Sequence, residues 1–127
     1  MVILIKKDFK HKTYKDSVLT AYIGLKKAFK SEKNFKVHIL IGAFMLIIDI
    51  LIGISFGQLL LVLTLASTVL VAEIFNTCIE YICDAITQEY DSNIKNIKDI
   101  AAGGVLITGI SFFLMQILII GGVIFGK

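Results

Sequence analysis

The chain has 127 residues, of which 57% are hydrophobic, and its mean hydropathy is +0.86. An ordinary soluble domain is roughly 45–50% apolar, and a domain this short cannot cover so large an excess in a core of its own. The formal net charge is +3, and every basic residue is a lysine. Because the lysines flank hydrophobic segments instead of forming a soluble basic face, a membrane surface is a better partner than nucleic acid. The composition predicts one membrane-embedded domain and excludes a pair of soluble domains.

The N-terminal segment is basic and amphipathic, since ten of the thirteen lysines lie within residues 1–36. Apolar side chains recur there at steps of three and four residues, at Val18, Ala21, Tyr22, Leu25, Ala28 and Phe29. Lysines fill the other side of the same helical repeat. This pattern predicts an amphipathic helix over about 12–36 that lies in the membrane interface with its apolar face toward the lipid.

Three apolar segments follow, at residues 37–54, 58–86 and 100–126. At about 1.5 Å per residue each is long enough to cross a thin or average hydrocarbon core. A tight turn is expected at 55–57 and a polar loop at 87–99. The predicted fold class is an all-α integral membrane protein, with the N-terminal interfacial helix and three transmembrane helices forming a single domain.

The distribution of lysines predicts the topology. The N-terminal segment and the 87–99 loop lie on the same side of the membrane, because two spans separate them. Twelve lysines lie on that side and only Lys127 lies on the other. The positive-inside rule therefore places the N-terminus and the loop in the cytoplasm, and the C-terminus outside the cytoplasm, in the inner or plasma membrane of the cell.

The second apolar segment carries a stripe of polar groups. Glu73, Asn76, Glu80 and Asp84 are spaced by three, four and four residues, which places them on one helix face. Glu73 follows the start of this segment by roughly 22 Å, so the stripe begins inside the cytoplasmic leaflet and extends outward to the headgroups. An ionisable group at that depth costs roughly 2.5–3.5 kcal/mol, so we expect it to face protein or water. Neighbouring carboxylates repel unless a cation lies between them, and Mg²⁺ is the natural guest of such oxygen ligands.

Other polar groups near the cytoplasmic face leave two interpretations open. Glu32, Lys98 and Asp99 could join the stripe, because a lysine can neutralise a phosphate. They could equally be a surface glutamate, a snorkelling lysine and a helix-start aspartate. The stripe alone also fits a non-enzymatic small membrane subunit with a cation site. No glycine-rich phosphate loop of Walker type is present, which excludes that class of soluble kinase.

Three motifs resemble the prokaryotic diacylglycerol kinase family. The segment Glu73-Ile-Phe-Asn-Thr-Cys-Ile-Glu-Tyr-Ile-Cys-Asp84 resembles the family signature Glu-x-x-Asn-x-x-Ile-Glu-x-x-x-Asp. Ile97-Lys-Asp-Ile-Ala-Ala102 is similar to its Ala-Lys-Asp-x-Ala-Ala element. Ser31-Glu-Lys-Asn-Phe-Lys-Val-His38 resembles the Glu-x-Asn-Phe-basic-x-His stretch of the undecaprenol kinase branch. The resemblance covers nearly the whole chain, and the motifs occur in the same order.

The resemblance implies a homotrimeric integral-membrane lipid kinase that transfers the γ-phosphate of MgATP to a lipid alcohol. The element at residues 34–38 favours undecaprenol as the acceptor, and diacylglycerol is the alternative. Phosphoryl transfer depends on positioning and charge neutralisation more than on covalent chemistry, and the polar stripe suits that requirement.

The resemblance also implies roles for individual residues. Glu73 matches the general base and Asn76 the asparagine beside it. Glu32 and Glu80 match the glutamates that bind Mg²⁺ and, through it, ATP. The remaining ATP-site candidates are the phosphate-contacting Lys98, the nucleotide-site Asp99, and two N-terminal lysines without a secure register, Lys12 and Lys15. His38 and Asp91 depart from the better-known diacylglycerol kinases, which have a glutamate and a histidine there.

Overall fold

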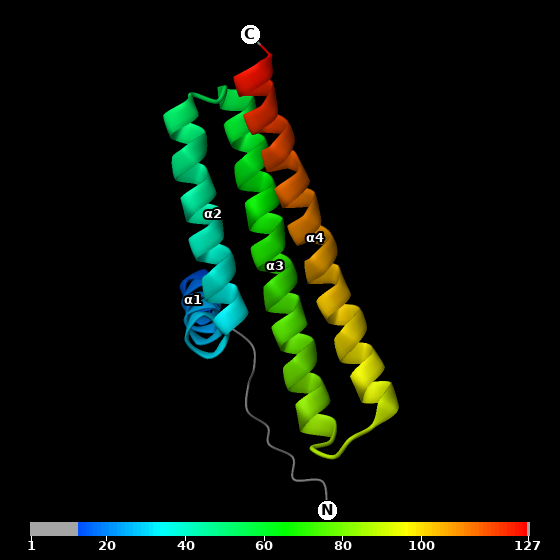
Figure 1. The fold of residues 1–127 in the computed structure, drawn as a ribbon. Helices are drawn as coiled ribbons and strands as arrows, with labels where there is room; N and C mark the ends of the chain where they lie inside the picture. The colour runs from blue at the N-terminus through cyan, green and yellow to red at the C-terminus, as the bar shows by residue number, and fades with distance from the viewer. Residues whose placement is uncertain (1–12, 127) are drawn as a thin grey trace, which may run out of the picture.

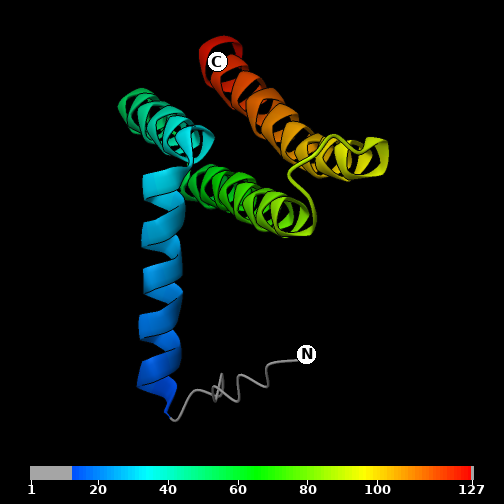
Figure 2. The ribbon, with the colours of Figure 1, turned by 90° about the horizontal axis from the view of Figure 1, so that it is seen from below.

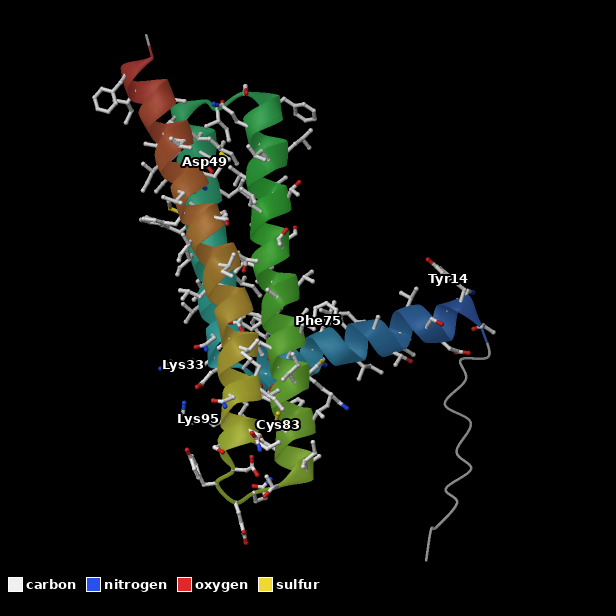
Figure 3. The ribbon with its side chains drawn as sticks, turned by 90° about the vertical axis from the view of Figure 1, so that its right-hand side faces the viewer. Tyr14, Lys33, Asp49, Phe75, Cys83 and Lys95 are labelled. Atoms are coloured by element: carbon white, nitrogen blue, oxygen red, sulfur yellow. The ribbon has the colours of Figure 1, made fainter. Side chains whose placement is uncertain are left out.

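The computed structural model describes residues 13–126, which form four helices and no strand. These are α1 (Tyr14–Ser31), α2 (Lys33–Ile52), α3 (Phe56–Ile86) and α4 (Ser92–Phe125). Helices α2, α3 and α4 run side by side in alternating directions, and α3 packs mainly against α4 (Figure 1). Helix α1 runs crosswise to these three and extends away from them (Figures 2 and 3).

Each of α2, α3 and α4 is long and apolar enough to cross a membrane. Helix α2 has 20 residues, a length of about 30 Å that matches a hydrocarbon core. Helices α3 and α4 have 31 and 34 residues, so they are longer by roughly 15 to 20 Å. Helices α2 and α3 meet at about the same level where α2 turns into α3, and α4 ends slightly beyond them (Figure 1). The extra length of α3 and α4 therefore projects past α2 at the other end, as a helical hairpin.

The junction between α1 and α2 is a sharp elbow at Glu32, whose backbone is extended (φ −97°, ψ 115°). Lys36 Nζ donates to the Lys30 carbonyl at 3.2 Å and lies 5.8 Å from the centre of the Phe29 ring. A lysine at this place satisfies one of the free carbonyls that end α1 and favours its negative dipole end. The predicted single helix over 12–36 is therefore divided, and residues 33–36 belong to α2.

A glycine ends α2. Gly53 has φ +74°, the left-handed conformation that only glycine adopts without steric cost, and its N–H bonds the Ile50 carbonyl at 3.1 Å. Ser55 then begins α3 with a capping box: its N–H donates to Gln58 Oε1 at 2.8 Å, and its hydroxyl accepts from the Gln58 N–H at 3.3 Å. The turn thus lies slightly earlier than the predicted 55–57.

The predicted loop over 87–99 is wrong for most of its length, because α4 begins at Ser92. Asp91 Oδ1 accepts from the N–H groups of Asn93 at 2.7 Å and Ile94 at 3.1 Å, which makes Asp91 the N-cap of this helix. The polar residues there indicate a segment outside the membrane, but such a segment can still be helical. Lys98 and Asp99 consequently lie on α4.

The apolar core is small and lies between α3 and α4. It consists of Val62 and Val69 on α3, and of Phe112 and Ile119 on α4. The members of each pair are seven residues apart, which is two helical turns along one face. Most other large apolar side chains of the three long helices are exposed. This is the pattern of helices whose outer faces contact lipid.

A buried polar pair links α2 to α4 at the end opposite the polar stripe. Gln116 Nε2 donates to Asp49 Oδ2 at 2.8 Å, and the two residues are 1% and 0% exposed. Figure 3 shows Asp49 near the end where α2 turns into α3. The pair explains the one acidic interruption of the first apolar segment, because a buried carboxylate needs a hydrogen-bond donor.

Candidate functional site

The polar stripe on α3 faces the inside of the helix bundle where it is deepest. Glu73 is 4% exposed and Asn76 is 8% exposed, and they continue the buried face that Val62 and Val69 begin. Glu80 is half-buried and Asp84 is exposed. The expectation that an ionisable group in a span faces protein is therefore confirmed for Glu73.

The rise of about 1.5 Å per residue gives the position of each polar group of the stripe along the axis of α3. Glu73 lies about 26 Å from the start of α3, close to the length of α2. Glu80 lies about 36 Å and Asp84 about 42 Å from the same point, on the projecting part of the helix. The stripe thus runs from the boundary of the apolar layer to the hairpin beyond it.

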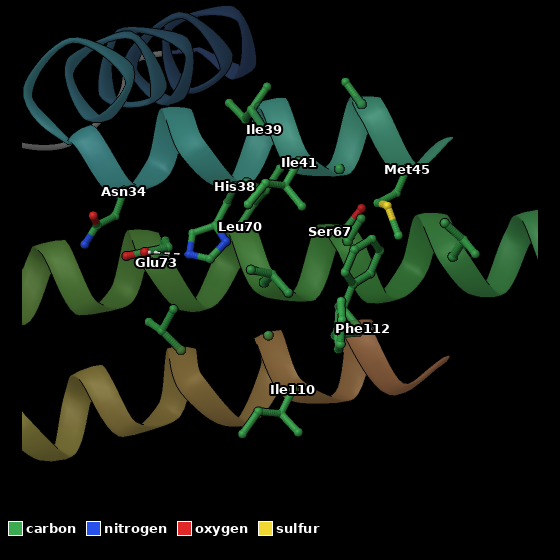
Figure 4. A pocket seen from close by; sticks show the side chains of 18 of the residues that line it. Asn34, His38, Ile39, Ile41, Met45, Ser67, Leu70, Glu73, Ile110 and Phe112 are labelled. Carbon is green, nitrogen blue, oxygen red and sulfur yellow. Dashed lines mark ion pairs between the residues drawn. The ribbon is translucent and has the colours of Figure 1, made fainter. Parts of the chain in front are cut away.

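Glu73 is paired with a histidine of the neighbouring helix. His38 Nε2 on α2 lies 3.1 Å from Glu73 Oε1, and the side chains are 29% and 5% exposed. Figure 4 shows the two groups pointing toward each other across the gap between α2 and α3. The pair gives the buried carboxylate a donor, and it leaves the second carboxylate oxygen open.

Asn76 and Glu80 form the next pair along α3. Asn76 Nδ2 donates to Glu80 Oε1 at 3.1 Å, across one helical turn. The other end of the amide, Asn76 Oδ1, is buried and has no partner among the described residues. A buried acceptor without a donor is costly, so this oxygen is available to a bound molecule or ion.

Glu32 reaches α3 through a tyrosine. The Tyr81 hydroxyl lies 3.3 Å from Glu32 Oε1 and 3.0 Å from Ser31 Oγ, close enough to donate to either. Ser31 Oγ also lies 3.0 Å from Glu32 Oε1. Because Tyr81 follows Glu80 directly, these contacts hold the elbow between α1 and α2 at the level of Glu80. The structure therefore joins Glu32 to α3 at Tyr81, next in sequence to Glu80, while Glu73, Asn76 and Glu80 share one face of α3.

Lys98 and Asp99 lie farther out, on the projecting hairpin. Lys98 Nζ lies 2.5 Å from Asp84 Oδ1, an ion pair that joins α4 to α3. Asp99 is paired with Lys95, one turn earlier on α4. Both candidate nucleotide residues thus have protein partners, and a nucleotide would have to compete with Asp84 for Lys98.

Lys15 is not part of this group. Lys15 lies at the outer end of α1, beside Tyr14 (Figure 3), about 25 Å along the helix from the elbow. It is not brought to the other site residues of the chain. Lys12 lies outside the described residues.

The oxygen donors near Glu80 fit a hard divalent cation. Within residues 13–126 no group of three or more histidine, cysteine, aspartate and glutamate side chains converges on a metal position. Mg²⁺ does not need such a cage, because it is typically held by one or two carboxylates together with water and substrate phosphates. Glu80, with Glu32 at the elbow that contacts Tyr81, offers carboxylates of the kind that Mg²⁺ takes, whereas a zinc site would use histidine or cysteine.

A cavity of about 800 Å³ lies between α2, α3 and α4. Asn34, His38, Glu73 and Asn76 line one end of it, and apolar side chains line most of the rest. Figure 4 shows Leu70, Met45 and Phe112 along the apolar part. The buried carboxylate therefore lies where a long apolar cavity ends in polar groups.

Two contacts of the site were not predicted from the sequence. The sequence placed His38 in the element that resembles undecaprenol kinases and as a departure from other kinases, without a partner, although a histidine in an apolar segment is itself a signal of a polar partner. Tyr81 carried no signal, because an aromatic residue between two acidic ones is typical of an interfacial helix.

The profile of the family described as "Prokaryotic diacylglycerol kinase" matches residues 19–120. The chain is 28% identical over 96 residues to a protein of Bacillus subtilis named undecaprenol kinase, a match that covers 76% of this chain and 78% of that one. It is also 28% identical over 92 residues to a diacylglycerol kinase of Synechocystis, which covers 72% of this chain and about half (53%) of the relative. Three apolar helices and a match over most of the length agree with a membrane protein. The chain belongs to the prokaryotic diacylglycerol kinase family of membrane lipid kinases.

Proposed function

We propose that this protein transfers the γ-phosphate of MgATP to the hydroxyl group of a lipid alcohol, with undecaprenol as the favoured acceptor. One observation carries the proposal: Glu73, a buried carboxylate, lies at the polar end of a long apolar cavity. A lipid alcohol has the same division, an apolar tail that ends in one hydroxyl. The kinases among the relatives favour this enzyme over a non-enzymatic subunit with a cation site.

On the acceptor side, the tail occupies the cavity and the hydroxyl meets Glu73. Glu73 acts as the general base that takes the hydroxyl proton. Asn76 lines the same polar end of the cavity and orients the acceptor lipid there. The apolar lining excludes water, which would otherwise compete as the phosphate acceptor.

On the donor side, Glu32 and Glu80 would hold Mg²⁺ together with the phosphates of ATP. When bound, the ion neutralises the charge that develops on the transferred phosphoryl group. Lys98 moves from Asp84 to the phosphate chain, since both partners are anionic and the phosphates carry more charge. Asp99 belongs to the nucleotide side as well. Lys12 stays a candidate for phosphate contact, whereas Lys15 lies about 25 Å along α1 from the elbow, too far to reach the phosphates at the site of its own chain.

Undecaprenol is favoured over diacylglycerol on two grounds. The element at residues 34–38 supplies Asn34 and His38 to the polar end of the cavity. Farther in, the lining is almost entirely hydrocarbon, which suits an unsubstituted polyprenyl tail. Diacylglycerol remains the second candidate, because one of the relatives carries that name.

The acceptor is identified with radiolabelled ATP, the purified protein in detergent, and a panel of lipid alcohols. We expect label in undecaprenol at a higher kcat/KM than in diacylglycerol. The matched control is a polyprenyl phosphate, which has the same tail and no free hydroxyl and should remain unlabelled. Label in diacylglycerol alone would assign the second candidate, and no label in any lipid would contradict the proposed function.

We further propose a homotrimer whose α1 and projecting hairpin lie on the cytoplasmic side. Twelve of the thirteen lysines support this orientation, and exposed apolar side chains on the three long helices leave ample surface for packing between copies. A reporter enzyme that works only outside the cytoplasm is expected to be active when it is fused after Lys127. A cytoplasmic signal from that fusion would overturn the orientation.

A further inference from the structure

We infer that His38 is a positioning residue that holds Glu73 in the orientation required for proton abstraction, an inference that rests on the proposed function. The carboxylate of a glutamate rotates about three side-chain bonds, and ordering it carries an entropic cost. A general base must lie within hydrogen-bond reach of the acceptor hydroxyl. Some group therefore has to hold the carboxylate, and the structure supplies His38.

The contact is specific to one carboxylate oxygen. His38 Nε2 lies 3.1 Å from Glu73 Oε1, an ion-pair contact, and because an ionised carboxylate only accepts, the proton between the two atoms belongs to Nε2. Among the described residues no second protein group bonds Glu73, and both residues line the cavity. Oε1 is thus engaged by α2, while Oε2 is left for the hydroxyl of a lipid in the cavity (Figure 4).

The two side chains of the pair also differ in their exposure to solvent. Glu73 is almost completely enclosed, whereas the side chain of His38 is 29% exposed. Asn34 lies one turn before His38 and lines the same polar end of the cavity. The imidazole thus lies beside the enclosed carboxylate on the wall of the cavity, where it can orient the base (Figure 4).

The first test compares two replacements of His38. His38→Leu removes the donor, and we expect kcat to fall by about ten- to hundredfold, the factor that a hydrogen bond to a charged group is worth. His38→Gln keeps a neutral N–H donor at nearly the reach of Nε2 and should retain most of kcat. The KM for MgATP should stay near the original value in both, because the nucleotide side is built on other residues.

The second test is a double-mutant cycle with the base. If His38 acts through Glu73, His38→Leu should lower kcat no further in a Glu73→Gln background. Additive losses would instead mean that His38 acts independently of Glu73. The cycle also separates the two hypotheses: full turnover by Glu73→Gln alone would contradict the proposed base, whereas an inactive Glu73→Gln beside a fully active His38→Leu would contradict only the role of His38.

A third measurement excludes a purely structural role. His38→Ala leaves a space beside Glu73, and added imidazole is expected to restore kcat in a saturable manner. Equal melting temperatures of His38→Ala and His38→Gln in detergent are the folding control. If both variants are folded and equally slow, and imidazole restores neither, the hydrogen bond does not position the base and the inference is wrong.

Discussion

Replacing Glu73 by glutamine is expected to lower kcat by about 10²–10⁴-fold and to leave the affinity for MgATP near the original value. The substitution keeps the shape of the side chain and an oxygen that can accept from His38 Nε2. It removes only the ability to take a proton. Glu73 is also about 10 Å along α3 from Glu80, too far for both to hold one ion directly.

The measurement is the affinity for MgATP by calorimetry beside the single-turnover rate with a lipid acceptor. Glu89→Gln is the matched control, since Glu89 is an exposed glutamate in the loop between α3 and α4 and should retain full activity. Loss of nucleotide binding by Glu73→Gln with an intact chemical step would move Glu73 from the acceptor side to the metal side.

Glu80→Gln is expected to abolish turnover and to weaken MgATP binding itself, while the protein remains folded in detergent. The carboxylate of Glu80 is half-buried and receives a hydrogen bond from Asn76, so it is held in place as an oxygen ligand. A neutral amide binds Mg²⁺ far less well than a carboxylate does. The loss should therefore appear in the ground-state affinity, in contrast to the loss in Glu73→Gln.

Glu32→Gln should raise the Mg²⁺ concentration needed for half-maximal activity, because this carboxylate reaches the same level from the elbow through Tyr81. Activity is measured as a function of free Mg²⁺ at a fixed concentration of ATP. Unchanged Mg²⁺ dependence in both glutamate variants would remove Glu32 and Glu80 from the metal site. Asn76→Ala is expected to lower kcat as Glu73→Gln does, but by a smaller factor. It should also weaken MgATP binding slightly, because Glu80 loses the hydrogen bond from Asn76.

The sequence was informative wherever one helix carries the whole pattern. Apolar runs separated by glycine and polar residues are sufficient to predict three long helices, because in lipid the backbone N–H and C=O groups of each run must form hydrogen bonds within that run. The stripe from Glu73 to Glu80 was predictable for the same reason, since spacings of three and four residues define one face without any partner. The resemblance to known kinases then attached chemistry to that face.

Contacts between helices were decided by the tertiary structure. The pairs His38–Glu73, Tyr81–Glu32 and Gln116–Asp49 each join residues 35 or more positions apart in the chain. No periodicity within one segment encodes such a pair, because it depends on how far each helix is rotated and shifted against the next. The start of α4 at Ser92 was likewise not predicted. Polarity indicates where a chain leaves the membrane, whereas the helix begins where Asp91 caps it.

The amino-acid pattern alone thus determined which segments are long and apolar enough to span a membrane and which face of α3 is polar, because lipid and helical repeat act on each segment separately. The packing of α2 and the elbow against α3 decided which oxygen of Glu73 is occupied, which residue of α3 Glu32 contacts, and where the cavity ends. These features arise from close packing between side chains of different helices, and they exist only once the helices meet.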